Sequence, residues 1–337
     1  MDKTLFLKKT KMAGLTKYQG SFETYLKQTV SVGSPAGLYL PIQYLFELGG
    51  KRLRPVLVLM AAEAFGNQKK EALPAALAVE VFHNFTLMHD DIMDEAPLRR
   101  GAATVHQKWN LNTAILSGDA MMIQAYQALE SYKAPLFGKL TRLLSKTAIE
   151  VCEGQQYDLD FESEQEVSQE QYLEMIRLKT AVLVGCALKM GAWIGGAQDH
   201  QAQLIFDFGE LLGTAFQIQD DYLDAFGDPA SFGKQVGGDI IENKKTILYH
   251  QAMSKGSQEE QRNLKKWFTS QTDPAEAAQK IEAVKTLFET TGAREASRNL
   301  VGHYTQIAFE KLESLTISEQ GKTLFKAFGT QLMERKF

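Results

Sequence analysis

The feature that most constrains the fold is a succession of long segments with helical periodicity. Residues 74–91 begin with a proline suited to a first helical turn and carry an apolar stripe. Strand signals are scarce, since no series of alternating runs and no Asn-Gly hairpin turn occurs. Several segments are apolar on more than one face, which is typical of helices buried inside a bundle. Further helices are predicted at residues 113–131, 139–161, 169–196, 203–226 and 274–291.

The chain as a whole is predicted to form one all-α domain spanning residues 1–337. No linker, repeat or low-complexity segment divides it, and its 44% apolar and 23% charged residues are an ordinary globular balance. The net charge of −4 favours neither nucleic acid nor an anionic membrane as a partner. Cys152 and Cys186 lack a metal-type spacing and are expected to be small core residues in a reducing compartment.

No segment indicates export or membrane insertion. The N-terminal stretch has no long apolar run and no cleavage pattern, so no signal peptide is expected. No run approaches the roughly 18 apolar residues of a membrane span. A cytoplasmic protein without membrane insertion is therefore the expectation.

Two acidic clusters with the same spacing end apolar segments. The first, DDIMD, holds Asp90, Asp91 and Asp94, and the second, DDYLD, holds Asp220, Asp221 and Asp224. A spacing of four residues returns the first and last aspartate to one helix face, where like charges repel. A solvated acidic helix end would explain one such cluster. Two clusters on separate bundle helices predict opposed walls of a cavity that hold divalent ions, and Mg²⁺ suits carboxylates and substrate phosphates.

Basic residues accompany both acidic clusters. GGKRLRP, residues 49–55, offers cations beside two glycines, and LRRG follows the first cluster directly. FGKQVGGDIIENKKT, residues 232–246, follows the second, and a Lys-Thr pair interrupts the apolar segment 169–196. Arginine forks and lysine point charges match phosphate oxygens, and glycines let the backbone approach a ligand. This recurrence predicts two polyanionic ligands, one bound through metal and one bound directly.

Three further polar residues lie near the acidic clusters. His83 stands seven residues before Asp90 and could donate a hydrogen bond to a diphosphate, or could be an ordinary core residue. Gln217 shares a helix face with Asp221 and could bond a metal ligand, a ligand oxygen or another core group. His89 receives no assignment.

Together these motifs resemble those of the trans-polyprenyl diphosphate synthases, the farnesyl and geranylgeranyl diphosphate synthase family. GGKRLRP, DDIMD with LRRG, the Lys-Thr pair, QDDYLD and FGK occur in the family's order over about residues 45–250. The resemblance implies an isoprenoid synthase-type bundle around a deep cavity, normally a homodimer. It also implies three Mg²⁺ ions per active site, with Mn²⁺ as an alternative.

The resemblance also implies roles for individual residues. Mg²⁺ would be held by Asp90, Asp91, Asp94, Asp220, Asp221 and Asp224. The allylic substrate or its diphosphate would contact Arg99, Lys179, Thr180, Gln217, Lys234 and Lys244. Isopentenyl diphosphate would bind Lys51, Arg54, His83 and Arg100. The catalytic candidates are Asp90, Asp91, Asp94, Lys179, Asp220 and Lys234.

The implied reaction joins isopentenyl diphosphate head-to-tail to dimethylallyl, geranyl or farnesyl diphosphate. The size of the side chains one or two turns before Asp90 would limit product length, and the residues concerned are Phe82, Phe85 and Thr86. One aromatic at the fifth position before the motif resembles makers of geranylgeranyl diphosphate (C20), and two resemble makers of farnesyl diphosphate (C15). C20 is favoured, with C15 as the alternative. A class I terpene cyclase and a divalent-ion scaffold are the competing hypotheses, although a cyclase needs no second diphosphate site.

Overall fold

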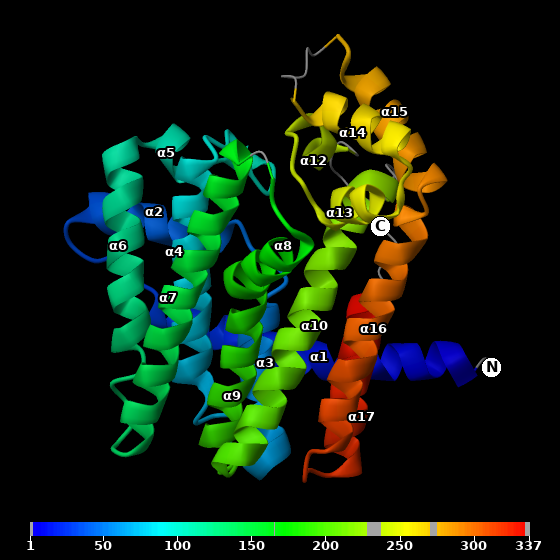
Figure 1. The fold of residues 1–337 in the computed structure, drawn as a ribbon. Helices are drawn as coiled ribbons and strands as arrows, with labels where there is room; N and C mark the ends of the chain where they lie inside the picture. The colour runs from blue at the N-terminus through cyan, green and yellow to red at the C-terminus, as the bar shows by residue number, and fades with distance from the viewer. Residues whose placement is uncertain (1–2, 165, 228–236, 270–274, 334–337) are drawn as a thin grey trace. The chain divides into compact units, whose positions relative to one another are not determined.

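The computed structural model describes residues 3–164, 166–227, 237–269 and 275–333, with side chains from residue 15 onward, and is built almost entirely of helices (Figure 1). Its elements are α1 (Lys3–Thr29), α2 (Ala36–Glu47), α3 (Leu53–Gly66), α4 (Leu73–Met93), β1 (Leu98–Arg99), β2 (Ala102–Ala103), α5 (Val105–Lys108), α6 (Leu111–Gln127), α7 (Leu136–Ser163), α8 (Gln169–Ile176), the π-helix η1 (Arg177–Ala181), α9 (Val182–Ile194), α10 (Asp199–Phe226), α12 (Gly238–Ile241), α13 (Ile247–Lys255), α14 (Gln258–Thr269), α15 (Ala277–Thr290), α16 (Ala293–Glu313) and α17 (Glu319–Met333). The predicted all-α class is confirmed.

Most predicted helices are present, with two corrections. The segment 113–131 leaves the α-helix after Gln127, because α6 ends there. The segment 169–196 is not one regular helix, since the five residues of η1 separate α8 from α9. Such π-helical turns insert one extra residue per turn and are frequent at functional sites.

The chain divides into two compact units. Unit 1 comprises residues 1–145, 186–203 and 316–318, and unit 2 comprises residues 146–185, 204–315 and 319–337. Helices α7, α9 and α10 contribute residues to both. The single domain over 1–337 stays a prediction.

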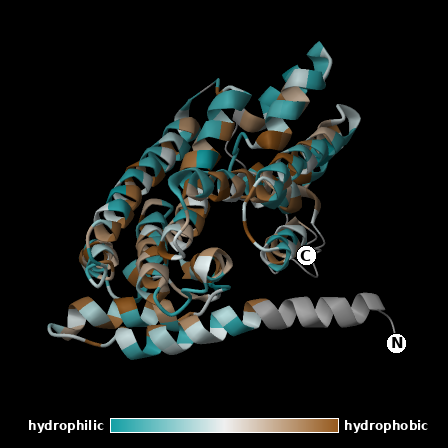
Figure 2. Ribbon diagram, turned by 90° about the horizontal axis from the view of Figure 1, so that it is seen from below, coloured by the Kyte–Doolittle hydropathy of each residue, from teal (hydrophilic) through white to brown (hydrophobic). Residues whose placement is uncertain are grey.

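The core of unit 1 is built around α3 and α4. Residues 55–62 of α3 are buried on every side, as the all-round apolar sequence predicts. Helix α4 packs along α6 and α3 (Figure 1). Hydrophobic and hydrophilic residues alternate along the helices of the molecule (Figure 2). Cys186 is buried as predicted, but Cys152 of unit 2 is exposed, so its assignment to the core was wrong.

A short hairpin follows α4 in unit 1. Strands β1 and β2 pair antiparallel, with Leu98 opposite Ala103 and Arg99 opposite Ala102. Arg100 and Gly101 form the turn, and both have positive φ, at 55° and 80°. A two-residue turn with positive φ at both positions matches the twist of a hairpin. No strand signal in the sequence predicted this element.

The core of unit 2 surrounds α13. This helix packs against α14, α15 and α16 through buried apolar residues such as Leu248, Val284 and Phe288. Helix α8 begins with a capping box in which Ser168 and Gln171 exchange side-chain and backbone hydrogen bonds. Among the described helices of either unit, none has the length and apolarity that a bilayer crossing requires.

Candidate active site

The first acidic motif lies at the C-terminal end of α4, in unit 1. Asp90 and Asp91 occupy the last turn, and the backbone N–H of Asp94 closes it on the carbonyl of Asp90 at 2.8 Å. The three aspartates differ in environment: Asp91 is only 2% exposed, Asp90 is half-buried and Asp94 is exposed. Asp90 and Asp94 are therefore the more accessible carboxylates of this motif.

Asp91 is held by an arginine that the hairpin returns to the helix. Arg99 donates from Nε and from Nη2 to Oδ1 of Asp91, at 2.9 and 2.5 Å. A bidentate guanidinium–carboxylate pair is strong and directional. The predicted metal ligand Asp91 and the predicted phosphate ligand Arg99 thus meet each other in this structure.

A basic cluster lies next to the motif in unit 1. Nη1 of Arg54 contacts Nε2 of His83 at 3.0 Å, and Arg100 donates to the carbonyl of Gly49. Burial, followed by the charges of Arg54 and Arg100, lowers the pKa of His83 well below its usual range. Burial also lowers the pKa of Arg54 to about 10. Exposed Lys51 belongs to the same loop, so the four residues predicted for isopentenyl diphosphate lie in one unit.

Arg52, the remaining cation of GGKRLRP, turns into the core instead. It pairs with Glu80 of α4 at 2.7 Å and Glu23 of α1 at 3.0 Å, and also donates to the carbonyl of Phe46. Its backbone adopts a left-handed conformation with φ of 49°. Arg52 therefore fastens the loop, which leaves Lys51 and Arg54 as the ligand candidates.

The three candidate chain-length residues lie on α4. Phe82 is fully buried and Phe85 nearly so, with ring centroids 5.6 Å apart. The hydroxyl of Thr86 donates to the carbonyl of His83, within its own helix. Among the three chain-length candidates, Phe82 and Phe85 therefore carry the bulky side chains.

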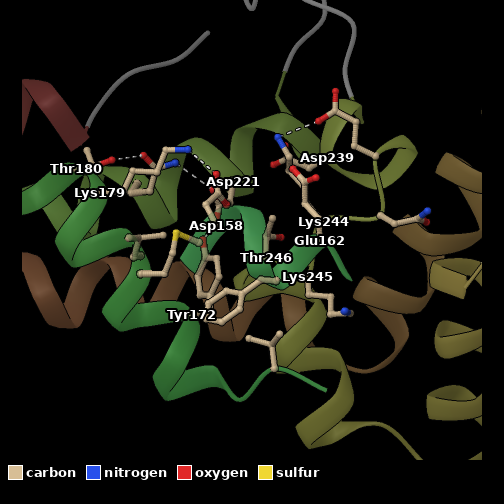
Figure 3. Close-up of a pocket in the computed structure, with 17 residues that line it drawn as sticks. Asp158, Glu162, Tyr172, Lys179, Thr180, Asp221, Asp239, Lys244, Lys245 and Thr246 are labelled. Atoms are coloured by element: carbon tan, nitrogen blue, oxygen red, sulfur yellow. Dashed lines mark hydrogen bonds and ion pairs between the residues drawn. The ribbon is translucent and has the colours of Figure 1, made fainter. Parts of the chain in front are cut away.

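The second acidic motif lies near the end of α10, in unit 2, beside a pocket of about 190 Å³ (Figure 3). Asp221 lines this pocket and is 7% exposed, whereas Asp220 and Asp224 are half-buried. The hydroxyl of Tyr172 donates to Oδ2 of Asp221, and Nε2 of Gln217 lies 3.3 Å from Oδ1. Two neutral donors thus hold the buried aspartate of this motif.

Lys179 and Thr180 reach the same pocket from η1. The ammonium of Lys179 pairs with Asp158 of α7, and the hydroxyl of Thr180 lies 3.5 Å from Oε1 of Gln217 (Figure 3). Gly154 lets α7 approach η1 closely, because a Cβ there would lie 2.2 Å from the backbone nitrogen of Lys179. Lys179, Thr180 and Gln217, which were all predicted to contact the allylic substrate, thus line one pocket.

Helix α12 and the loop that follows it supply further acidic and basic side chains to the pocket. Burial, with the charge of Asp224, raises the pKa of Asp239 to about 7. Lys244 pairs with Glu242 at 2.9 Å; burial opposes its charge, but Glu242 raises its pKa above the ordinary value. Lys245 runs away from this pair and donates to the carbonyl of Glu164 (Figure 3). Lys234 lies outside the described residues.

Asp221, like Asp239, lies near other carboxylates. Burial raises its pKa well above the usual range, and the charges of Asp239, Asp224 and Asp158 add to this, against a backbone hydrogen bond from Ile247. Several carboxylates that disfavour one another's ionisation suit a bound cation, and oxygen donors suit a hard divalent one.

Within the described parts of the chain, no three acidic, histidine or cysteine side chains are gathered closely enough to enclose a metal. The half-buried Asp220 and Asp224 offer carboxylate oxygens, the donors that suit Mg²⁺, an ion that usually keeps several waters and shares a substrate phosphate.

Several partners of the predicted residues in this pocket were not found from the sequence. Asp158 pairs with Lys179, Tyr172 bonds Asp221, and Asp239 faces Lys244. Asp239 stands within the basic segment 232–246, so its proximity to the cations was a usable signal. Asp158 and Tyr172 come from helices remote in sequence and carried no motif in a single sequence.

The structure thus defines a class of helical protein with two acidic motifs, each of which has cationic side chains nearby. Comparison with known proteins narrows this class. The family model described as polyprenyl synthetase matches residues 35–287. The chain belongs to the polyprenyl synthetase family.

Three relatives illustrate the similarity. The geranylgeranyl diphosphate synthase of Methanosarcina mazei is 38% identical over 93% of this chain and 94% of its own. The crystal structure of a geranylgeranyl pyrophosphate synthase superposes with a TM-score of 0.92 at 51% identity, covering 96% of this chain and 99% of that one. The geranylfarnesyl diphosphate synthase of Natronomonas pharaonis is 34% identical over 93% of this chain and 94% of its own.

Proposed function

We propose that the chain condenses isopentenyl diphosphate with allylic diphosphates to form geranylgeranyl diphosphate. The observation that carries this proposal is the pairing of DDxxD motifs on α4 and α10 with cations, in a relative of geranylgeranyl diphosphate synthases. Allylic primers are dimethylallyl, geranyl and farnesyl diphosphate.

The allylic diphosphate is assigned to the second aspartate motif and the pocket beside it in unit 2. Lys179 and Lys244 stabilise the charge that grows on the diphosphate as the allylic C–O bond breaks. Mg²⁺, held by the motif carboxylates, would supply Lewis-acid stabilisation of that same charge. Asp90, Asp94, Asp220 and Asp224 are more exposed than Asp91 and Asp221, so these four are the preferred ligands.

Isopentenyl diphosphate is assigned to the basic cluster of unit 1. Arg54, His83, Arg100 and Lys51 bind its diphosphate, because the neighbouring arginines make this site favour an anion. Its alkene attacks the allylic carbon, a new C–C bond forms, and the departing diphosphate accepts the proton that is lost. The apolar wall around Phe85 keeps water from the carbocation.

The test is incubation with Mg²⁺, isopentenyl diphosphate and each allylic primer, followed by mass analysis of the products. Linear C20 diphosphate as the main product supports the proposal. Cyclic hydrocarbons would indicate a terpene cyclase, and a main product of C15 or C25 would replace the C20 assignment. Unconsumed substrates together with tight calcium binding would indicate a scaffold.

Phe85 is proposed to form the floor of the product cavity. It stands five residues before Asp90 and is nearly buried beside Phe82. Phe85→Ala removes a ring and is expected to lengthen the products beyond C20. An unchanged product profile would place the floor elsewhere.

A cytoplasmic homodimer is proposed as the working form. Helix α6 exposes four large apolar side chains that a second copy of the chain would cover, namely Leu111, Ile115, Leu116 and Ile123. Sedimentation of the parent and of Leu116→Lys/Ile123→Lys checks this assignment. A monomeric parent at micromolar concentration would contradict it.

A further inference from the structure

His89 is the one titratable residue of the HDDIMD segment without a role in the proposed chemistry, and its contacts in unit 1 are specific. Its ring meets the ring of Phe85 edge to face, with centroids 4.7 Å apart. Phe85 in turn packs on Phe82 at 5.6 Å. The three residues are spaced i, i+3 and i+7, so they form one row of rings along α4 with His89 at its end.

The other side of His89 fits into a notch on α6. Nε2 of His89 lies 3.2 Å from the carbonyl oxygen of Ile115. The notch exists because residue 118 is glycine: a Cβ there would lie 2.2 Å from Nε2 and 2.4 Å from Cδ2 of His89. Asp119 adds a carboxylate oxygen 3.9 Å from Nε2. The imidazole is thus fixed between the backbone of α6 and the ring of Phe85.

We propose that His89 is a positioning residue that holds the ring of Phe85 and thereby affects product length. Gly118 of α6 leaves the space that the imidazole of His89 occupies. This inference rests on the proposed function, because it assigns Phe85 to the floor of the product cavity. His89 transmits the position of the α6 backbone to the ring of Phe85. The depth of the cavity then depends on a contact between two helices as well as on the size of residue 85.

The physical argument is one of packing freedom. A side chain in a close-packed interior keeps one rotamer only while every side of it is filled. Removing the imidazole leaves one side of the Phe85 ring open, so the ring can swing out of the path of a growing chain. Adding a methyl group at residue 118 does the opposite, since it drives the imidazole out of its notch and against Phe85.

The test compares the product distributions of purified variants with farnesyl diphosphate as the primer. His89→Ala is expected to raise the ratio of C25 to C20 product about two- to tenfold, the scale of one aromatic contact. Gly118→Ala is expected to lower the same ratio. In a Phe85→Ala background, His89→Ala should change nothing further, because the ring on which it acts is absent.

Two matched controls separate this role from general damage. His106→Ala removes a histidine of α5, and Gly37→Ala adds a methyl group where nothing lies within 4 Å; both should keep the parent distribution. Because the ratio is measured among products, a lower turnover beside Asp90 does not obscure it. Should His89→Ala fail to fold, Gly118→Ala carries the same test without altering α4.

The outcomes distinguish the two proposals. A parent that forms no linear prenyl diphosphate refutes the proposed function. An active parent with unchanged ratios in His89→Ala and Gly118→Ala overturns the positioning role alone. An equal shift from His89→Ala in the Phe85→Ala background overturns it as well, because His89 would then act independently of that ring.

Discussion

The two acidic motifs share a spacing but differ in the way their buried aspartate is held. Asp91 of unit 1 receives a bidentate arginine, so its charge is balanced inside the protein. Asp221 of unit 2 receives a tyrosine hydroxyl and a glutamine amide, which are neutral. Its further neighbours are carboxylates, and burial together with their charges raises its pKa.

The same sequence motif therefore occurs in two electrostatic environments, one with a bound arginine and one with neutral donors. The first motif includes a buried aspartate that is neutralised by Arg99, and its more exposed carboxylates are Asp90 and Asp94. The second motif lies among carboxylates whose charge Lys179, Lys244 and ions from solution can balance. Unit 2 should therefore respond to divalent ions more strongly than unit 1.

The largest effect on turnover is expected when either motif loses its more exposed carboxylates. Asp90→Ala/Asp94→Ala, and separately Asp220→Ala, should each lower turnover by about 1,000-fold, because the charge developing on the leaving group loses its stabilisation. Steady-state rates measure the loss, and circular dichroism should show intact helicity. Rates equal to the parent would refute the metal-binding role.

The next effect tests the asymmetry itself through stability. Arg99→Leu leaves the carboxylate of Asp91 buried without its cation, which should lower the free energy of unfolding by about 3 kcal/mol. Tyr172→Phe removes one neutral donor from Asp221 and should cost about 1 kcal/mol. Urea denaturation without Mg²⁺ measures both. Arg142→Leu, at an exposed arginine of α7, is the control and should change little. Equal losses from Arg99→Leu and Tyr172→Phe would remove the contrast between the motifs.

Helical periodicity predicted where the motifs lie, but it could not predict their partners. A spacing of four residues predicts that Asp90 and Asp94 share a face, but it did not predict that Asp91 is the buried aspartate. The partner of Asp91 is eight residues away, on the first strand of a hairpin whose turn, Arg100-Gly101, is not one of the usual turn pairs. The partner of Asp221 is 49 residues away.

The π-helical turn around Lys179 could not be predicted from the sequence either. Periodicity shows an uninterrupted helical pattern over 169–196, and the π-helical turn depends on tertiary contacts. Gly154 allows the close approach of α7, and Arg177 bonds Glu210 of α10 at 2.6 Å. These contacts join segments that are 25 and 33 residues apart (179 − 154 and 210 − 177), so no local pattern records them.

The buried histidines extend the comparison to pH. His83 has a lowered pKa through burial and arginine charges, whereas burial is the main cause for His250, whose pKa falls to about 4. His250 is 6% exposed, and its unfolded form takes a proton near pH 6.5 while the folded form does not. Stability is therefore lost as pH falls from about 6.5 towards 4.

His250→Asn should remove this part of the pH dependence. Between pH 7 and 5 the parent should lose about 2 kcal/mol more unfolding free energy than the variant, because only the parent's unfolded chain gains this proton. Urea denaturation at both pH values gives the difference. Parallel losses in the two proteins would show that His250 does not control it.

The smallest effect concerns how Tyr172 orients Asp221. Its hydroxyl favours the ionised carboxylate and fixes one oxygen, so Tyr172→Phe should raise the half-saturating Mg²⁺ concentration about fivefold, the equivalent of one hydrogen bond. Tyr249→Phe is the matched control. Tyr249 is equally buried and also packs on His250, with ring centroids 5.7 Å apart against 5.5 Å for Tyr172, but it does not line the pocket. If both variants need the same Mg²⁺ concentration as the parent, the hydroxyl shapes only packing, and the second motif holds Asp221 in place without it.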